Sequence, residues 1–224
     1  MSNTSNSKGE KGSKFWMQEI VNEPSRKKIL EKILGDNLIF LSPLQSECYK
    51  EYQLKEQKIF SNALGLDKSE FKKKFSFWAT NQPHWDAIAT SADGKILYLF
   101  EAKAHLKELQ SKIRASSAKS IEKNINSMKK VFDEISIGNA NFSSWTDKYY
   151  QLGNRFTFLQ EMNQIKFPKI ERTNLILLNI TDDKTYIPTS KENWQKHYEE
   201  VFEEMTGNKN PPTDVKILYF SGAD

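Results

Sequence analysis

The elements that the sequence predicts follow an order typical of an α/β protein with a central mixed β-sheet flanked by helices. Two β-prone runs, 84–92 and 95–103, flank an Asp-Gly turn at 93–94, a strong signal for an antiparallel hairpin. Further apolar runs of strand length, 173–180 and 215–220, each follow a segment with helical periodicity. Strands reached through helices tend to be parallel, so the sheet should contain both orientations.

The N-terminal elements follow from local patterns. Residues 1–14 contain no apolar side chain after Met1, which predicts a disordered tail, and residues 15–224 should form a single domain. A helix is expected over 15–34 with an interruption near Pro24, followed by a short buried strand at 38–41.

The next segment should be a helix that begins at Ser42-Pro43, with serine as its N-cap and proline at its first helical position. It should continue to about Leu64, where Gly65 ends it. A short segment with a cap at Asp67 or Ser69 then precedes the hairpin. The apolar residues of that segment are Phe71, Phe75 and Trp78.

After the hairpin, apolar residues recur at steps of three or four, as in a helix. They are Ile121, Ile125, Met128, Phe132 and Ile135. A loop at 139–144 should lead into a helix over 145–162, and one more helix, with Trp194 and Tyr198 on its apolar face, should precede the last strand.

Composition narrows the class of protein. With 38% hydrophobic and 28% charged residues, and no apolar run of membrane-spanning length, no membrane association is expected. The N-terminus lacks the apolar stretch of a signal peptide. The single cysteine, Cys48, allows no intramolecular disulfide and no structural zinc site, and it suits a cytoplasmic location.

The net charge of +4 comes mostly from lysine. Lysine enrichment can reflect genome composition, or it can mark a surface that faces phosphates, and this net charge does not decide between them. Lysines 119, 123, 129 and 130 share one predicted helix, where they can contact a nucleic-acid backbone or form a solvated face.

The hairpin should place two carboxylates face to face. Counting outward from its turn, Ala87 pairs with Phe100 and Asp86 lies opposite Glu101, with Lys103 on the same face as Glu101. Opposed like charges destabilise a sheet, and a divalent cation between them would remove the repulsion. Without a cation, at least one of the two carboxylates should have a raised pKa.

Glu101 and Lys103 also interrupt an apolar strand, which has three readings. They can form a buried ion pair, or the strand can have emerged into solvent. In the functional reading, Asp86 and Glu101 hold Mg²⁺ (or Mn²⁺), with the Ala102 carbonyl as a further ligand. Lys103 would then position or help deprotonate a water molecule, or stabilise charge on a phosphate.

The chain resembles the PD-(D/E)xK nuclease superfamily, and within it a bacterial group, over roughly residues 38–220. The motifs that carry the resemblance are Ser42-Pro43-Leu44, Phe77-Trp78, Trp85-Asp86-Ala87, Glu101-Ala102-Lys103-Ala104-His105, Tyr149-Tyr150-Gln151 and Asn154-Arg155. Pro83 departs from the pattern, because it lies three residues before Asp86 instead of next to it. The resemblance implies a restriction-endonuclease-like fold, and it implies hydrolysis of phosphodiester bonds, with DNA as the expected substrate.

The resemblance adds further candidate residues. A glutamate on the helix before the hairpin would be catalytic; Glu51 is preferred over Glu47, although either can be a solvated helix charge. The polar cluster in the later helix would bind substrate, or it can be a polar helix surface. Its members are Tyr150, Gln151, Asn154 and Arg155. His84 and His105 are expected to be structural or solvent-facing.

The sequence thus predicts a Mg²⁺- or Mn²⁺-dependent nuclease, with nucleic acid as partner. Two alternatives stay open: a non-catalytic nucleic-acid-binding protein on the same fold, and a metal-free α/β interaction module in which Glu101 and Lys103 pair structurally. The oligomeric state is also open, a homodimer included.

Overall fold

The computed structural model of the protein describes residues 8–113 and 117–223. Its strands are β1 (Leu38–Ser42), β2 (Ala87–Ser91), β3 (Ile96–Lys103), β4 (Arg172–Thr181) and β5 (Val215–Ser221). Its α-helices are α1 (Gly12–Asn22), α2 (Pro24–Leu34), α3 (Lys68–Lys74), α4 (Ala118–Ile135), α5 (Phe142–Asp147), α6 (Tyr150–Gln164) and α7 (Lys191–Thr206). The short helical turns are η1 (Gln45–Glu47), η2 (Lys58–Ala63) and η3 (Leu106–Leu109).

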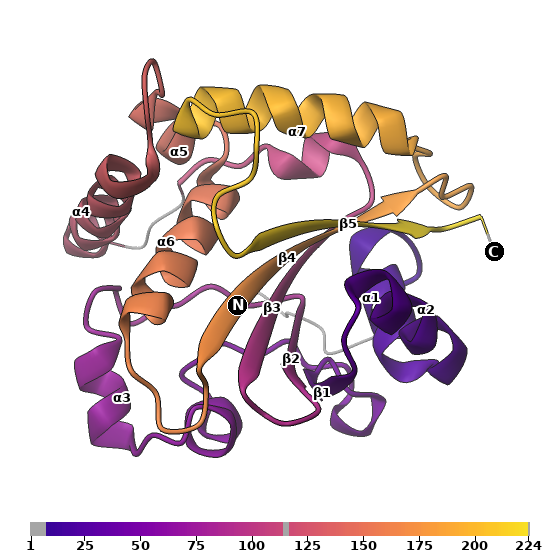
Figure 1. The fold of residues 1–224 in the computed structure, drawn as a ribbon, viewed down its shortest axis with the longest axis horizontal. Coiled ribbons are helices and arrows are strands. Elements are labelled where there is room, and N and C mark those ends of the chain that lie inside the picture. Colours follow the sequence, from indigo (N-terminus) through magenta and orange to yellow (C-terminus); the bar gives the residue numbers. More distant parts are fainter. Residues whose placement is uncertain (1–7, 114–116, 224) are drawn as a thin grey trace.

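The strands form one five-stranded mixed sheet in the order β1-β2-β3-β4-β5, which confirms the α/β class (Figure 1). The β1–β2 and β2–β3 pairs are antiparallel. β2 and β3 are joined by a short turn, whereas η1, η2 and α3 lie between β1 and β2. The β3–β4 and β4–β5 pairs are parallel, and helices connect these strands. The element order predicts the antiparallel hairpin and the two parallel pairs, but β1 differs: it is antiparallel to β2 although helical segments lie between them.

Helices cover both faces of the sheet, and each face has its own hydrophobic core (Figure 1). Helices α1 and α2 pack on one face, where Trp16 and Ile20 meet Phe100. Helices α4 to α7 pack on the other, where Phe156 and Phe202 meet Leu99. Side chains alternate along a strand, so Glu101 and Lys103 of β3 share the face of Leu99, beneath α6 and α7.

Three predicted elements differ from the structure. The helix over 43–64 is wrong: only η1 and η2 are helical there, because Cys48 and Tyr49 have positive φ angles of 53° and 56° that a right-handed helix cannot contain. The helix over 145–162 is divided, since α5 begins at Phe142 and α6 begins only at Tyr150.

The N-terminal tail was predicted to extend to residue 14, but the described part of it is ordered and partly helical. Residues 1–7 lie outside the described residues, but α1 already begins at Gly12. The Lys8 ammonium lies 2.8 Å from the Glu19 carboxylate, and the Gly9 amide donates to Gln18 Oε1 at 2.7 Å. These polar bonds hold a segment without apolar side chains against α1. Among the described residues, no helix has the length and apolar character needed to cross a membrane.

Two glycines that end helices allow a matched test of the packing. Gly35 and Gly207 end α2 and α7 with φ angles of +78° and +75°. A Cβ on Gly35 would meet open space, but a Cβ on Gly207 would overlap the carbonyl oxygen of Ile137. Gly35→Ala should cost roughly 1 kcal/mol for the left-handed backbone, and Gly207→Ala about 1–3 kcal/mol more for the clash. Urea unfolding of both variants measures the difference, and equal losses would contradict the packing of α7 on Ile137.

Candidate active site

The hairpin has the predicted register. Ala87 pairs with Phe100, and Ala89 pairs with Tyr98. Asp86 follows the same register: its amide donates to the Phe100 carbonyl at 3.2 Å, and its Oδ2 accepts from the Ala102 amide at 2.7 Å. The Asp86 carboxylate therefore lies against the backbone of β3 next to Glu101.

The Glu101 carboxylate is buried between two cations, with 1% of the residue exposed. Its Oε1 accepts a hydrogen bond from Lys103 Nζ. Its Oε2 accepts from Arg155 Nε at 2.7 Å and lies 2.6 Å from Arg155 Nη2. Buried charges need such partners, because desolvation of an isolated carboxylate is costly. The buried Glu101–Lys103 pair, one of the readings left open by the sequence, is present and is extended by an arginine from α6.

Arg155 holds several parts of the site together. Besides Glu101, its guanidinium donates to the His84 carbonyl at 2.8 Å and to Asn154 Oδ1 at 2.9 Å. Its Cζ lies 4.4 Å from the centroid of the Trp85 ring. Only 3% of Arg155 is exposed, because these contacts surround it. The residue predicted to bind substrate therefore orients Glu101 in this structure.

Of the other polar residues of α6, Gln151 contacts Lys103, whereas Tyr150 contacts helix α4. Gln151 Oε1 accepts from Lys103 Nζ at 3.3 Å, which places Gln151 at the site. Asn154 reaches it only through Arg155. Tyr150 instead shares a hydrogen bond with Asn124 of α4. Burial raises the pKa of its phenol, and the hydrogen bond to Asn124 only partly opposes this rise. Of the predicted substrate-binding residues, Gln151 is thus the one that contacts Lys103.

Glu51 belongs to the site, but not through the helix that the sequence predicts. It lies in the loop between η1 and η2, and the Tyr52 carbonyl next to it accepts from the Trp85 amide at 3.1 Å. Burial raises the pKa of Glu51, and the charge of Glu101 raises it further, while Lys14, Arg155 and Lys103 oppose the rise. Glu47 points elsewhere, since its carboxylate binds Lys58 at 2.7 Å and Tyr52 at 3.0 Å.

The two hairpin carboxylates titrate in opposite directions. Burial and the nearby charge of Glu101 raise the pKa of Asp86 from 3.8 to about 8, which confirms that one carboxylate of the pair is raised. Burial would also raise the pKa of Glu101, but the charges and hydrogen bonds of Arg155 and Lys103 hold it below its usual range. For Lys103, burial is outweighed by Glu101 and Asp86, and its pKa is raised.

The donor set suits a hard divalent cation. Among residues 8–113 and 117–223, no group of three or more His, Cys, Asp or Glu side chains is arranged to hold a metal ion. Magnesium, however, is commonly held by one or two carboxylates together with water and substrate phosphates. Asp86 and Glu101 supply two carboxylates. Burial, and then the charge of Glu101, raise the pKa of Asp86, and a bound cation would favour its ionised form. The residues present therefore fit such an ion.

Sequence reasoning missed two buried neighbours of the site. Asn179 of β4 pairs with Lys103 of β3 in the parallel ladder, so both side chains lie on the same face. Asn179 Oδ1 accepts from the Tyr198 hydroxyl at 2.9 Å, and its Nδ2 donates to the Leu177 carbonyl at 3.1 Å. The signal was visible, because Asn179 interrupts the apolar run of β4 as Glu101 interrupts that of β3.

Neutralising Asp86 should stabilise the metal-free protein. Between about pH 4 and pH 8 the folded state keeps the Asp86 proton that the unfolded state has released, so stability falls as pH rises through this window. Asp86→Asn retains an acceptor for the Ala102 amide and should remove this slope. The variant should therefore be more stable than wild type at pH 8 in EDTA and equally stable near pH 4.

The control is Asp93→Asn in the exposed hairpin turn. Hydrogen bonds from the Ser91 hydroxyl and the Lys95 amide lower the pKa of Asp93, so this variant should lose stability at neutral pH. Thermal unfolding of both variants from pH 4 to pH 9 compares the two signs. A loss of stability in Asp86→Asn at pH 8 would show that its carboxylate has a structural role.

Comparison with protein-family models, with curated proteins and with solved structures finds no match for this chain.

Proposed function

We propose that the protein is a Mg²⁺- or Mn²⁺-dependent nuclease with a restriction-endonuclease-like fold, and that it hydrolyses phosphodiester bonds in DNA. The observation that carries the proposal is the convergence of Glu51, Asp86, Glu101 and Lys103, which come from a loop, the residue before β2, and β3. Buried acidic and basic groups with shifted pKa values cluster at functional sites more often than elsewhere. The resemblance of the hairpin motif to PD-(D/E)xK nucleases supplies the reaction class.

Asp86 and Glu101 would hold the metal ion, with the Ala102 carbonyl as a further ligand. The ion, when bound, supplies Lewis-acid stabilisation of phosphate charge and a more acidic water molecule. Lys103 is protonated at neutral pH, because Glu101 and Asp86 raise its pKa. A protonated ammonium cannot accept a proton from water, so of its candidate roles the structure favours stabilisation of phosphate charge.

The remaining residues keep this arrangement in place. Two nitrogen atoms of Arg155 bind the Glu101 carboxylate, and Gln151 Oε1 accepts a hydrogen bond from Lys103. Glu51, which has a raised pKa, is available as a proton acceptor or donor near the pair. Helix α6 positions Arg155 and Gln151, and the loop before the hairpin positions Glu51.

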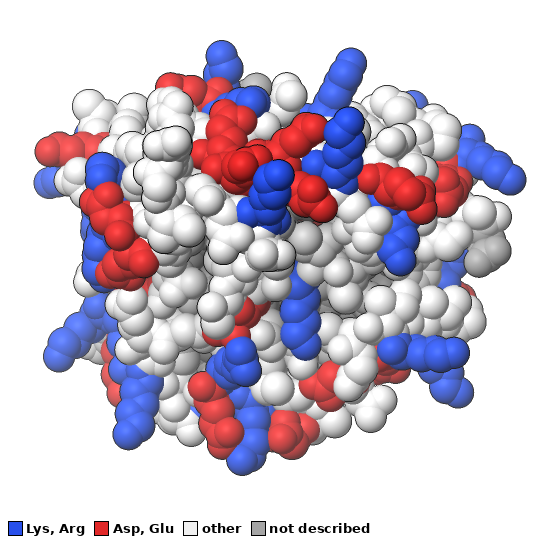
Figure 2. All heavy atoms as spheres, turned by 45° about the horizontal axis from the view of Figure 1, so that its top comes forward, with Lys and Arg blue, Asp and Glu red and all other residues white. Residues whose placement is uncertain are grey.

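Charge on the surface limits how nucleic acid can approach. Figure 2 looks onto the side of the molecule that α7 covers, and acidic side chains gather there with lysines between them. The acidic residues of α7 are Glu192, Glu199, Glu200, Glu203 and Glu204. A polyanion is repelled by such a face, so DNA should approach from another side of the molecule.

The test is cleavage of labelled single- and double-stranded DNA and RNA with Mg²⁺, with Mn²⁺ and with EDTA. We expect DNA to be cut with either metal and to stay intact in EDTA. If every substrate stays intact under all conditions, the proposal fails.

One observation favours a second candidate, a metal-free interaction module. Both oxygens of Glu101 already bind cationic side chains, Lys103 and Arg155. In that case the charges serve the fold alone, and the protein should show no saturable binding of Mn²⁺ in a calorimetric titration.

A further inference from the structure

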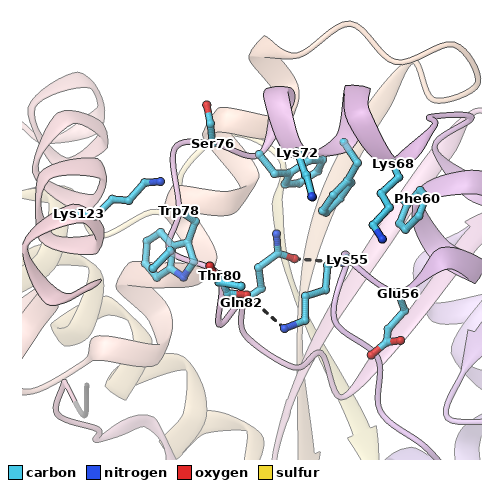
Figure 3. A pocket seen from close by; sticks show the side chains of 13 residues that line it. Lys55, Glu56, Phe60, Lys68, Lys72, Ser76, Trp78, Thr80, Gln82 and Lys123 are labelled. Atoms are coloured by element: carbon cyan, nitrogen blue, oxygen red, sulfur yellow. Dashed lines mark hydrogen bonds between the residues drawn. The ribbon is translucent and has the colours of Figure 1, made fainter. Parts of the chain in front are cut away.

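A lysine-rimmed pocket lies outside the site described above. It has a volume of about 520 Å³ and lies between α3, the segments 55–60 and 76–82, and Lys123 of α4 (Figure 3). Lys68 and Lys72 extend from α3 into this space, and Lys123 reaches toward it from the other side. Pockets of this size accommodate a small organic group.

The inner wall of the pocket is aromatic and firmly packed. Phe71 stacks on Phe75 with ring centroids 4.2 Å apart, and Phe60 lies 5.2 Å from Phe71. Trp78 meets Phe158 edge to face at 5.2 Å. Of these, Phe60, Phe71, Phe75 and Trp78 line the pocket. An aromatic wall held by its neighbours is a surface on which a nucleobase can stack.

The rim is positively charged. Lysines 55, 68, 72 and 123 are all exposed, and none of them forms an ion pair within the part of the chain that the structure describes. The acidic residue of the lining, Glu56, is 3.7 Å from Lys50. By contrast, the next two lysines along α4, Lys129 and Lys130, pair with acidic side chains. Lys55 Nζ donates to the Thr80 carbonyl at 3.2 Å. Because no described acidic group neutralises its lysines, the rim complements an anion such as a phosphate.

Two chain segments connect this pocket to the candidate active site. The segment 51–55 runs beside the segment 82–86: Gln53 Nε2 donates to the Gln82 carbonyl at 2.6 Å, and Gln82 Oε1 accepts from the Lys55 amide at 3.1 Å. One end of this pair carries Gln82 and Lys55 of the pocket, and the other carries Glu51 and Asp86. Four residues of extended chain span at most ~14 Å, so the pocket and the site lie within a few nucleotides of each other.

We propose that this pocket binds one unstacked base of a single-stranded DNA segment, with the neighbouring phosphates on its rim lysines. The inference rests on the proposed nuclease function and names the form of its substrate. A base must leave its stack to enter a pocket, which costs least in a single strand. Stacking on the aromatic wall and contacts with the rim together favour a nucleotide over a simple anion or an apolar molecule.

The test is binding of fluorescent oligothymidylate in EDTA, measured by anisotropy at several salt concentrations. The variant Lys68→Gln/Lys72→Gln should bind at least ~10-fold more weakly. The slope of log affinity against log salt concentration should become shallower by about one to two. Its control is Lys28→Gln/Lys32→Gln on α2, which removes two exposed lysines of the same spacing from the opposite face of the sheet. This control should change affinity less than twofold.

Two further arms test the base itself. A strand with abasic residues should bind at least ~5-fold more weakly than oligothymidylate, because stacking contributes about 1–3 kcal/mol per base. Thr80→Phe, which fills the pocket from an exposed lining position, should remove this difference. Equal binding of the abasic strand, equal binding by the Lys68→Gln/Lys72→Gln variant, or equal competition by polyglutamate or by duplex DNA would overturn the proposal.

These outcomes differ from failure of the nuclease proposal. If wild-type protein binds through the pocket but cuts no substrate with Mg²⁺ or Mn²⁺, the pocket stands and the nuclease function falls. If wild-type protein cuts DNA and the pocket variants bind and cut equally well, the pocket inference falls alone.

Discussion

Lys103→Ala should abolish cleavage of DNA while leaving the binding of Mn²⁺ largely intact. Lys103 is protonated and lies beside Glu101, where its charge can stabilise the phosphate in the transition state but cannot serve as a metal ligand. Loss of one such group typically lowers a rate by about 100-fold to 1,000-fold. The measurement is the initial rate of cleavage at saturating Mn²⁺, together with a calorimetric titration of the same variant.

The control for this prediction is Lys95→Ala, directly before β3. Lys95 is exposed and pairs with Glu171 at 2.7 Å, far from Glu101 along the same strand. It should cut DNA at the wild-type rate. If Lys103→Ala also retains the wild-type rate, the roles assigned here are wrong even if the protein is a nuclease.

Glu101→Gln should destabilise the protein in metal-free buffer by roughly 3–5 kcal/mol, because it leaves two buried cations without their carboxylate. Lys103 and Arg155 both bind Glu101 and are both more than nine-tenths buried. For a chain of this length the loss corresponds to a fall in Tm of roughly 10 °C. The sign is opposite to that expected for Asp86→Asn, although the two carboxylates are neighbours in the hairpin.

The pH dependence follows from the lowered pKa of Glu101. The stability that its charge provides is present above its ordinary pKa and is lost as pH falls, so the difference between wild type and Glu101→Gln should shrink in acid. Glu171→Gln is the matched control, since Glu171 forms an exposed pair and should change stability by less than ~1 kcal/mol. A stable Glu101→Gln variant at pH 7 would show that the buried pairs do not hold this part of the fold.

The hairpin was predictable from the sequence because its short turn determines which residues face each other. Asp-Gly at the turn places Ala87 opposite Phe100, and the two-residue turn determines this pairing by itself. The parallel pairs were predictable because α4 to α6 connect β3 to β4 and α7 connects β4 to β5, although β1 shows that a helical connection does not by itself make a pair parallel. Strong local signals therefore determined the part of the fold that carries Asp86 and Glu101.

The helix before the hairpin could not be excluded from sequence alone. Residues 43–64 have an acceptable helical pattern, but Cys48 and Tyr49 adopt left-handed backbone conformations. Neither residue type is typical of that conformation, so the sequence does not indicate it. The neighbourhood of Glu51 depends instead on tertiary contacts, such as the bond from the Trp85 amide to the Tyr52 carbonyl. Glu51 therefore lies near Glu101 as predicted, but in a loop and not in a helix.

The role of Arg155 was equally hidden. Its bond to Glu101 joins residues 54 positions apart, and helical spacing shows only that Gln151 and Arg155 share a face. The acidic partner of Arg155 is determined by how α6 packs on the sheet, which the sequence does not show. Asn179 differs, because a polar residue inside an apolar strand is a local signal that could have been used.

The most direct measurement of the central idea is a calorimetric titration of Mn²⁺ into wild-type protein and into Asp86→Asn at neutral pH. A metal site between Asp86 and Glu101 predicts saturable binding to wild type that is at least ~10-fold weaker in the variant, with the fold of the variant intact. Absence of saturable binding to wild type, or equal affinity in the two proteins, would contradict it.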